Sequence, residues 1–404
     1  MQKKFKKVGT DFLYNIFASG IVTGIMQLLL YPVINKILGD IKYGNILTVM
    51  GIINTTSAVV GLSLNNIRLV NNAKNADKNL LGDYNLLLCI FNSLGTILVF
   101  TIAKGMFCLP VLECVGLGIL SLLMCCRTYW SVTFRLYLNF KKNFLMNLLL
   151  SIGYILGCGL IVIGINWSLA FILGEIFALF YIFKNSDIAR ESYRRTYRFK
   201  GIIHDYGILA LSSLSGNLLM YLDRLLLYPL LGASAVAVYT VAAFCGKTMG
   251  IVSTPIAGVL LSYYAQENFR MTRKRFWMIN GLIGALAILA VAIITPIAPY
   301  IIKILYSNLY DETVKIMYLA NIAAILGVVS NFIQPAILRF APPKWQVIKE
   351  ILYAVLYLGG GLYFLSVQGL VGFCIANIIA NSFKIILLLG VGNYYCTNTS
   401  VLTS

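Results

Sequence analysis

The sequence is poor in charged residues, and acidic ones are the scarcest. Of its 404 residues only 14 are Asp or Glu and 32 are Lys or Arg, so 11% of the chain is charged, against about 25% in ordinary soluble domains. The chain also contains a single histidine, His204. Protein zinc sites are built from clustered Cys and His, so a histidine-based metal centre is excluded. We expect no metal and no other cofactor.

Hydrophobic residues take the place of the missing charge. They make up 59% of the chain, and the mean hydropathy is +0.84. A soluble fold cannot hide this much apolar surface, so a cytosolic enzyme is excluded and an integral membrane protein is predicted. The formal net charge of +18 would also suit a nucleic-acid-binding protein, but such proteins gather their cations on one face of a soluble domain. Here the cations lie between long apolar runs, so no nucleic acid is expected.

The nine cysteines do not indicate a disulfide framework. Five of them lie inside apolar stretches: Cys89, Cys125, Cys158, Cys245 and Cys374. A free cysteine in such a position behaves as a small hydrophobic core residue.

Apolar stretches long enough to cross a membrane recur along the whole chain. A spanning helix needs about 20 mostly apolar residues, and this window predicts an all-α polytopic membrane protein with about twelve transmembrane helices. The predicted spans are Phe12–Tyr31, Ile46–Asn65, Tyr84–Ala103, Cys114–Phe134, Phe144–Ile165, Trp167–Phe183, Tyr206–Tyr228, Val236–Ser262, Trp277–Tyr300, Val314–Leu338, Val347–Ser366 and Leu370–Val391. Four lysines before the first span imitate a signal peptide, but no small-residue cleavage site follows, so we expect a retained helix.

The distribution of cations predicts the orientation. Cytoplasmic connections of membrane proteins carry an excess of Lys and Arg. If both termini are cytoplasmic, all but seven of the 32 cations fall on the cytoplasmic side. Lys247 lies in the middle of a span, and the outer cations are Lys36, Lys42, Lys104, Arg224, Lys303 and Lys315. Both termini are therefore predicted to be cytoplasmic, with an even number of spans between them.

The longest predicted cytoplasmic loop, residues 184–205, divides the chain into two lobes of six helices. The first lobe is residues 1–200 with this basic inter-lobe loop, and the second is residues 206–404. A faint repeat aligns Leu38-Gly39 with Leu231-Gly232, each just after the first span of its half. Because six is even, the lobes should be parallel repeats. The arginines of the loop follow a near-helical spacing and are predicted to rest on anionic lipids of the inner leaflet: Arg190, Arg194, Arg195 and Arg198.

No motif indicates an enzyme. Residues 245–248 (Cys-Gly-Lys-Thr) are similar to the end of a phosphate-binding loop, but that motif needs a glycine where Val241 stands. The segment also lies inside an apolar span, so nucleotide binding is rejected. Transport remains as the function of such a chain.

Ionisable side chains inside membrane spans are costly and mark candidate functional positions. The basic ones are predicted to bind an anionic group in a water-filled cavity: Arg127, Arg224, Lys247 and Arg68. The acidic ones, Asp223 and Glu175, would then balance charge or carry a coupling proton. The alternative interpretation is structural. Arg68 and a further residue, Lys384, would reach the cytoplasmic head groups, Arg224 would be an anchor at the outer interface, and Lys247 and Glu175 would be held in a buried ion pair between helices.

Short motifs at the start of each half resemble those of a known family. Tyr14-Asn15, Pro32 and residues 38–44 (Leu-Gly-Asp-Ile-Lys-Tyr-Gly) are similar to the opening of polysaccharide exporters of the multidrug/oligosaccharidyl-lipid/polysaccharide (MOP) superfamily. Gly61-Leu62 followed by Arg68 ends the second span as in those proteins. Leu222-Asp223-Arg224, followed by Leu231-Gly232 and Tyr239, resembles the start of their second lobe. The likeness is greatest to O-antigen flippases of the Wzx type.

This resemblance implies a MATE-like pair of six-helix lobes in the inner (cytoplasmic) membrane of a bacterium. It implies a flippase without enzymatic activity, which moves undecaprenyl-pyrophosphate-linked O-antigen units from the cytoplasmic to the periplasmic leaflet by alternating access, for lipopolysaccharide biosynthesis. The partners would be this lipid-linked oligosaccharide, anionic lipids, a coupling proton or sodium ion, and an O-antigen polymerase with its chain-length regulator. Two alternatives stay open: a multidrug-type exporter of small molecules, and an O-antigen polymerase, which should carry a large periplasmic loop.

Overall fold

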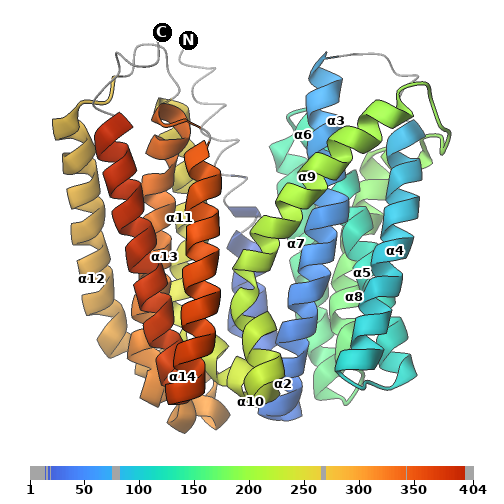
Figure 1. Ribbon diagram of the computed structural model, residues 1–404. Helices are drawn as coiled ribbons and strands as arrows, with labels where there is room; N and C mark the ends of the chain where they lie inside the picture. Colours follow the sequence, from blue (N-terminus) through green and yellow to red (C-terminus); the bar gives the residue numbers. More distant parts are fainter. Residues whose placement is uncertain are drawn as a thin grey trace. The chain divides into compact units, whose positions relative to one another are not determined.

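The computed structural model describes residues 20–74, 82–264, 270–342 and 344–395, together with Tyr14, Phe17 and Ala18. These residues are almost entirely helical, and none of them forms a β-strand (Figure 1). The predicted all-α architecture is therefore confirmed. Four features of the sequence lie outside the described residues: the N-terminal lysines, Phe12 at the start of the first predicted span, Asn15, and Lys78.

The chain divides into two compact units, Met1–Val236 and Ala237–Ser404. This division lies later in the chain than the predicted one, which followed the basic loop. The helices after that loop belong to the first unit because they pack on its second and third spans.

Unit 1 contains most of the helices of the chain. In order they are η1 (Met26–Leu30), α2 (Tyr31–Ser57), η2 (Ala58–Leu62), α3 (Ser63–Lys74), α4 (Gly82–Met106), α5 (Val111–Trp130), α6 (Val132–Leu136), α7 (Phe140–Val162), α8 (Trp167–Asn185), η4 (Ile188–Arg190), α9 (Phe199–Met220) and most of α10 (Leu222–Ala242). Helix α7 packs against α8, α4 against α5, and α9 against α2, α3 and η2.

Unit 2 begins within the end of α10. It continues with α11 (Phe244–Tyr264), α12 (Arg273–Leu305), η5 (Ser307–Leu309), α13 (Tyr310–Phe340) and α14 (Lys344–Tyr395). Helix α13 lies at its centre, since it packs against α11, α12 and α14.

Nine helical segments of the described residues are long and apolar enough to cross a membrane. Two of them, Gly20–Asn71 and Lys344–Tyr395, have 52 residues each, more than twice what one crossing needs. Both fold back on themselves. The rings of Trp345 and Tyr395, at the two ends of α14, lie 6.5 Å apart. Helix α14 is therefore a hairpin of two spans.

Single glycines make these reversals. The helical backbone is interrupted at Gly39 in α2, at Gly232 in α10 and at Gly369 in α14. The two arms of α10 continue α9 and α11. Counting each arm as a crossing gives twelve crossings within the described residues, as predicted.

The internal repeat has a structural basis in two of these turns. Gly39 has φ 81° and ψ 171°, and Gly232 has φ 82° and ψ −178°. This conformation is essentially restricted to glycine. The two turns also lie together in unit 1, where the Ser234 hydroxyl donates to the Asp40 carboxylate over 2.8 Å. Equivalent positions of the two halves therefore adopt the same turn.

Gly39→Ala and Gly232→Ala are each expected to destabilise the protein by about 1–3 kcal/mol, because a Cβ atom strains this backbone conformation. Thermal unfolding of the detergent-solubilised protein would measure the loss. Gly105→Ala in α4 is the matched control, since a Cβ there meets nothing within 4 Å and the backbone has no positive φ. Equal unfolding midpoints for all three variants would contradict the assignment of Gly39 and Gly232 as obligatory turn residues.

The other connections between an odd-numbered span and the following even-numbered one are also short. They are residues 107–110, 163–166 and 306–309. Connections after even-numbered spans include the longest described one, residues 186–198. The length of the connections thus alternates as the predicted distribution of cations does: the predicted outer connections are short, and the longest described connection is on the predicted cytoplasmic side.

Small residues bring helices of unit 1 into close contact. A Cβ atom at Gly153 of α7 would lie 2.4 Å from the Cα of Gly174 in α8, and one at Gly157 would lie 2.6 Å from the Cα of Ala170. Gly153 and Gly157 thus let α7 and α8 approach closely. Gly20 and Gly24 have the same spacing but no such contact, and the helix continues through residues 359–361.

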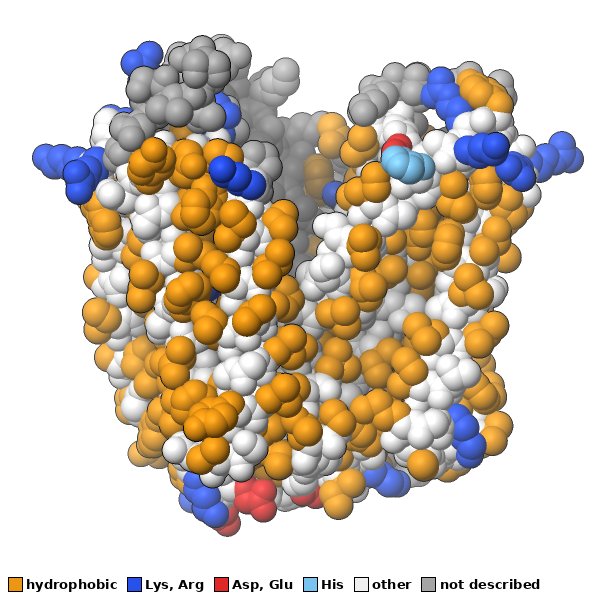
Figure 2. All heavy atoms as spheres, in the orientation of Figure 1, with side chains coloured by type: hydrophobic (Ala, Val, Ile, Leu, Met, Phe, Trp, Pro, Cys, Tyr) orange, Lys and Arg blue, Asp and Glu red, His pale blue; other side chains and the backbone are white. Residues whose placement is uncertain are grey.

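The sides of the helices expose many large apolar side chains (Figure 2). Along α12, for example, Leu282, Leu286 and Ile288 are 62%, 55% and 74% exposed. Lys and Arg side chains gather near the ends of the helices in the same view. Contiguous apolar surface of this extent suits contact with lipid and not with water. The chain is a multi-pass membrane protein.

Candidate functional site

Arg127, predicted to bind substrate, lies in a buried ion pair of unit 1. Its Nε is 2.6 Å from Oε2 of Glu175, and the Glu175 side chain is 0% exposed. The Tyr154 hydroxyl donates to the other carboxylate oxygen over 3.1 Å. Arg127 ends α5 and Glu175 lies within α8, so the pair joins two packed spans. The carboxylate compensates the charge of Arg127, and the buried pair considered for Glu175 exists with Arg127 as its partner.

Arg68 is also compensated. Its Nη2 is 2.7 Å from Oε1 of Glu191, its Nη1 donates to the Tyr129 hydroxyl over 2.8 Å, and its side chain is 4% exposed. The expectation that Arg68 reaches the lipid head groups is therefore wrong, because a side chain doing so would be exposed.

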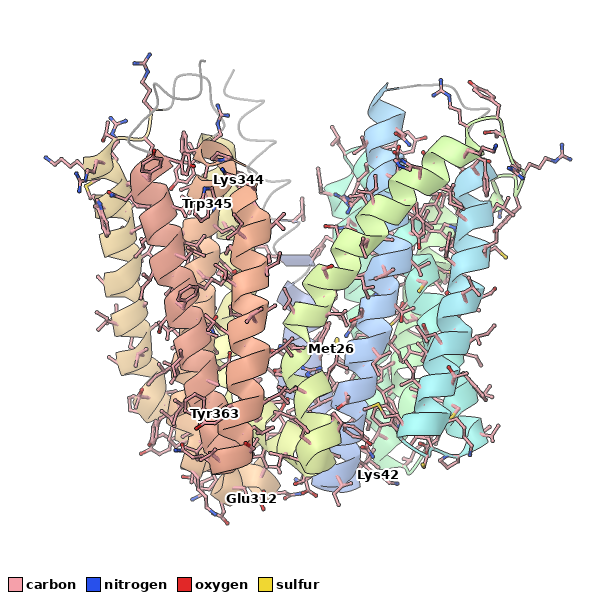
Figure 3. The ribbon with its side chains drawn as sticks, in the orientation of Figure 1. Met26, Lys42, Glu312, Lys344, Trp345 and Tyr363 are labelled. Atoms are coloured by element: carbon pink, nitrogen blue, oxygen red, sulfur yellow. The ribbon has the colours of Figure 1, made fainter. Side chains whose placement is uncertain are left out.

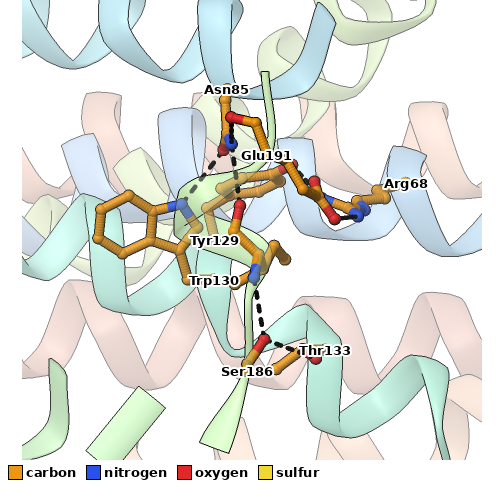
Figure 4. A network of polar contacts seen from close by, with 8 residues as sticks. Arg68, Asn85, Tyr129, Trp130, Thr133, Ser186 and Glu191 are labelled. Carbon is orange, nitrogen blue, oxygen red and sulfur yellow. Dashed lines mark hydrogen bonds and ion pairs between the residues drawn. The ribbon is translucent and has the colours of Figure 1, made fainter. Parts of the chain in front are cut away.

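The partners of Arg68 belong to a polar network that fastens the inter-lobe segment 186–198 to unit 1 (Figure 4). Asn85 of α4 donates to the Ile188 carbonyl over 2.9 Å and accepts from Trp130 Nε1 over 3.2 Å. Asp83 accepts from both the backbone amide and the hydroxyl of Thr196. Residues 191–196 of the segment are not helical, so the four arginines do not lie along one helix as their spacing predicted.

Three of the four arginines of this segment remain available to an outside partner. Arg190, Arg194 and Arg195 are exposed, whereas Arg198 is half-buried. Beside the network lies a cavity of about 390 Å³, whose lining includes Arg68, Asn139, Lys142 and Glu191. Both cations and carboxylates line this cavity, so it is not selective for one sign of charge.

Among the predicted basic site residues of unit 1, Arg224 is the one whose charge no described carboxylate balances. It lies in the first turn of α10, half-buried, and its Nη1 donates to the Leu47 carbonyl of α2 over 2.9 Å. The Tyr221 ring lies 5.4 Å from the guanidinium carbon. No carboxylate of the described residues lies within 4 Å of this guanidinium, and its buried Nε has no hydrogen-bond partner among them.

The depth of Arg224 also matters. It precedes the Gly232 turn by eight residues, which is about 12 Å of helix, and Leu47 follows the Gly39 turn by the same number. The Arg224 guanidinium therefore contacts α2 at the same distance from the Gly39 turn as Arg224 itself has from the Gly232 turn. This depth lies well inside the helical layer. Asp223 lies in the first turn of α10, is buried, and accepts from the Arg224 backbone amide over 2.8 Å. At this position Arg224 stays a predicted anion-binding residue, with the interface anchor as its alternative.

Lys247 of unit 2 is half-buried in α11, with its Nζ 5.1 Å from the centre of the Tyr239 ring. Asn377 of α14 donates to the Tyr239 hydroxyl over 2.7 Å and to the Tyr357 hydroxyl over 3.3 Å. Sequence reasoning missed these aromatic and amide partners. They hold the ring beneath Lys247 in place, and an ammonium group over a ring face gains cation–π attraction.

The predicted site residues thus fall into two classes. Arg68 and Arg127 have carboxylate partners and stabilise unit 1. Arg224 in unit 1 and Lys247 in unit 2 combine partial exposure with aromatic contacts. Arg224 and Lys247 stay the predicted anion-binding residues.

No family model and no curated protein matches the chain. Solved structures do match its fold. An inward-facing multidrug resistance MATE family transporter of the MOP superfamily is 15% identical, with a TM-score of 0.69 over 96% of this chain and 94% of that one. The lipid II flippase MurJ, in an inward closed conformation, is 14% identical, with a TM-score of 0.72 over 94% of this chain and 87% of that one.

A third similar structure is the Vibrio cholerae MATE transporter VcmN in its bent form, 14% identical with a TM-score of 0.59 over 96% of this chain and 98% of that one. At these identities the likeness is one of fold. The predicted MATE-like fold is confirmed.

Proposed function

We propose that this chain, which has the fold of MATE transporters and of the flippase MurJ, is a transporter that flips a lipid-linked oligosaccharide across the bacterial inner membrane. The substrate is an undecaprenyl-pyrophosphate-linked O-antigen unit, carried from the cytoplasmic to the periplasmic leaflet. The resemblance of residues 38–44 and 222–224 to polysaccharide exporters supports this substrate class.

The observation that carries the proposal is the uncompensated guanidinium of Arg224 inside the helical layer of unit 1. A diphosphate moving through a membrane protein must exchange its hydration for fixed cations, because an unpaired charge in hydrocarbon is very costly. Arginine offers two parallel N–H donors to phosphate, whereas lysine acts as a point charge. Arg224 and Lys247 supply one cation of each kind.

The proposed cycle leaves the prenyl chain in lipid and takes only the diphosphate and sugars through the protein. Alternating access exposes the binding cations first to the cytoplasm and then to the periplasm. A proton or sodium ion is the proposed coupling ion. An O-antigen polymerase and its chain-length regulator are the proposed downstream partners.

Two other functions fit the chain less well. A multidrug-type exporter of cationic compounds would need an unpaired carboxylate among its spans, but Glu175 is paired with Arg127, Glu350 is paired with Lys349, and Asp223 is buried. An O-antigen polymerase would need a large periplasmic loop, whereas the described connections on the predicted outer side have at most four residues.

Deletion of the gene tests the proposal. We expect the deletion strain to lose its lipopolysaccharide O-chains and plasmid-borne wild-type protein to restore them, as seen by gel electrophoresis of the lipopolysaccharide. A single repeat unit on the lipid core would indicate a polymerase instead. Unchanged O-chains combined with new sensitivity to toxic cations would indicate a multidrug exporter.

A further inference from the structure

Unit 2 contains a second group of basic side chains that the site described above does not include. Lys349 lies in the first arm of α14, and its side chain is 2% exposed. Lys384 lies in the second arm, half-buried, with its Nζ 4.6 Å from the centre of the Tyr353 ring. Lys384 was expected to reach the head groups, but it packs over an aromatic ring.

The charges of this group do not balance. Lys349 Nζ is 2.8 Å from Oε1 of Glu350, which is 41% exposed. Lys384 lies within electrostatic range of both Lys349 and Glu350, but no described carboxylate is within 4 Å of its ammonium group. Two largely dehydrated ammonium groups therefore share one carboxylate. An unmatched buried cation is expensive, so the arrangement favours an anion between or beside the two lysines.

The group lies near one end of unit 2. Figure 3 shows Lys344 and Trp345 at that end of the unit and Tyr363 towards the other. At a rise of 1.5 Å per residue, Lys349 is about 8 Å and Tyr353 about 14 Å along α14 from Lys344. The end that carries Lys344 is the predicted cytoplasmic one.

A row of aromatic rings connects this group with Lys247. The ring centres of Tyr353 and Tyr357 are 5.6 Å apart, those of Tyr357 and Phe373 5.8 Å, and those of Phe373 and Tyr239 5.1 Å. Lys384 lies over the first ring of the row and Lys247 over the last. The row thus links a basic group near the predicted cytoplasmic end to the deeper cation.

We propose that Lys384 and Lys349, with Tyr353, form a binding site for a phosphate or diphosphate group, which takes the head group of a membrane lipid at the cytoplasmic end of unit 2 before it reaches Lys247. The identity of the lipid rests on the proposed function, whereas the anion site rests on the two lysines and their shared carboxylate. Lys384, being half-buried, meets the ligand directly. Lys349 supplies its charge from behind.

Binding to the purified full-length protein tests this site, with farnesyl diphosphate and inorganic diphosphate as probes. Lys384→Ala is expected to weaken binding of farnesyl diphosphate about tenfold or more, because a charge-assisted contact to phosphate is lost. Lys384→Arg should retain much of the affinity. Lys344→Ala is the matched control, since Lys344 is an exposed lysine at the same end of α14.

Lys349→Gln provides a second variant, since it removes a charge without touching the proposed direct contact. Competition by inorganic diphosphate as strong as by farnesyl diphosphate would support the site and identify the diphosphate alone as the recognised group. A requirement for the prenyl chain would support it as a lipid site. Affinity for both probes unchanged in Lys384→Ala and Lys349→Gln would overturn the inference.

These outcomes are independent of the proposed function. If the deletion strain makes normal O-chains while diphosphate binding still depends on Lys384, the proposed substrate is wrong and the anion site stands. If O-chains are lost in the deletion strain but diphosphate binding does not depend on Lys384, the proposed function is supported and the proposed anion site is wrong.

Discussion

Replacing Glu175 by glutamine is expected to remove most of the folded protein from the membrane fraction. The change leaves Arg127 without its carboxylate in a site where the arginine side chain is only 16% exposed. Breaking one partner of such a pair costs about 3–5 kcal/mol, a large share of the roughly 5–15 kcal/mol that stabilises an ordinary domain. Protein abundance and the thermal unfolding midpoint in detergent would both measure the loss.

Two further variants make this expectation specific. The double variant Arg127→Met with Glu175→Leu should recover much of the stability, because apolar residues of similar volume often replace a buried pair at little cost. Glu312→Gln, at an exposed glutamate of α13, is the neutral control. Normal abundance of Glu175→Gln together with lost O-chain export would contradict a stabilising role and return Glu175 to the set of coupling residues.

Arg224→Ala and Lys247→Ala are expected to reduce O-chain export by about tenfold to a hundredfold at unchanged protein abundance. Each substitution removes a charge-assisted contact to the diphosphate, worth about 1.5–3 kcal/mol. Both side chains are half-buried, whereas Glu175 is fully buried, so stability should change less than in Glu175→Gln. The amount of long-chain lipopolysaccharide, normalised to the protein level, is the measurement.

Charge-retaining variants separate electrostatics from geometry. Lys247→Arg and Arg224→Lys should keep part of the activity if attraction of the diphosphate dominates. Lys303→Ala removes an exposed lysine at the end of α12 and should leave export unchanged. Full-length O-chains at normal expression in both alanine variants would show that Arg224 and Lys247 are anchors and not binding residues.

The fold followed from the sequence because apolar run length and cation alternation act over long segments. Twelve spans and the turns at Gly39 and Gly232 could be predicted, since a repeated Leu-Gly pair marks equivalent reversals. The end of unit 1 could not be predicted. Composition does not show whether the span after the basic loop packs against the helices before it or the helices after it in the chain. Here α9 packs against earlier helices, α2 and α3.

The roles of individual charges were harder to predict, because the sequence shows that a charge lies in a span but not whether a helix far away in sequence compensates it. Arg127 and Glu175 are separated by a full span, and nothing local pairs them. The aromatic row left a weak signal: Tyr353 and Tyr357, like Phe373 and Asn377, are four residues apart and so share a helix face. The chain has many tyrosines, so a spacing of four residues did not distinguish the members of this row from the others.

The short connections on the predicted outer side bear on how this protein is made. Residues 107–110, 163–166 and 306–309, with the glycine turns at Gly39, Gly232 and Gly369, leave almost no polar chain to translocate after each odd-numbered span. Two helices joined this tightly satisfy their own backbone groups and can enter lipid together. A nascent chain of twelve spans would then be inserted as six hairpins. The cation-rich connections between the hairpins would stay on the cytoplasmic side of the membrane, where the ribosome is, throughout insertion.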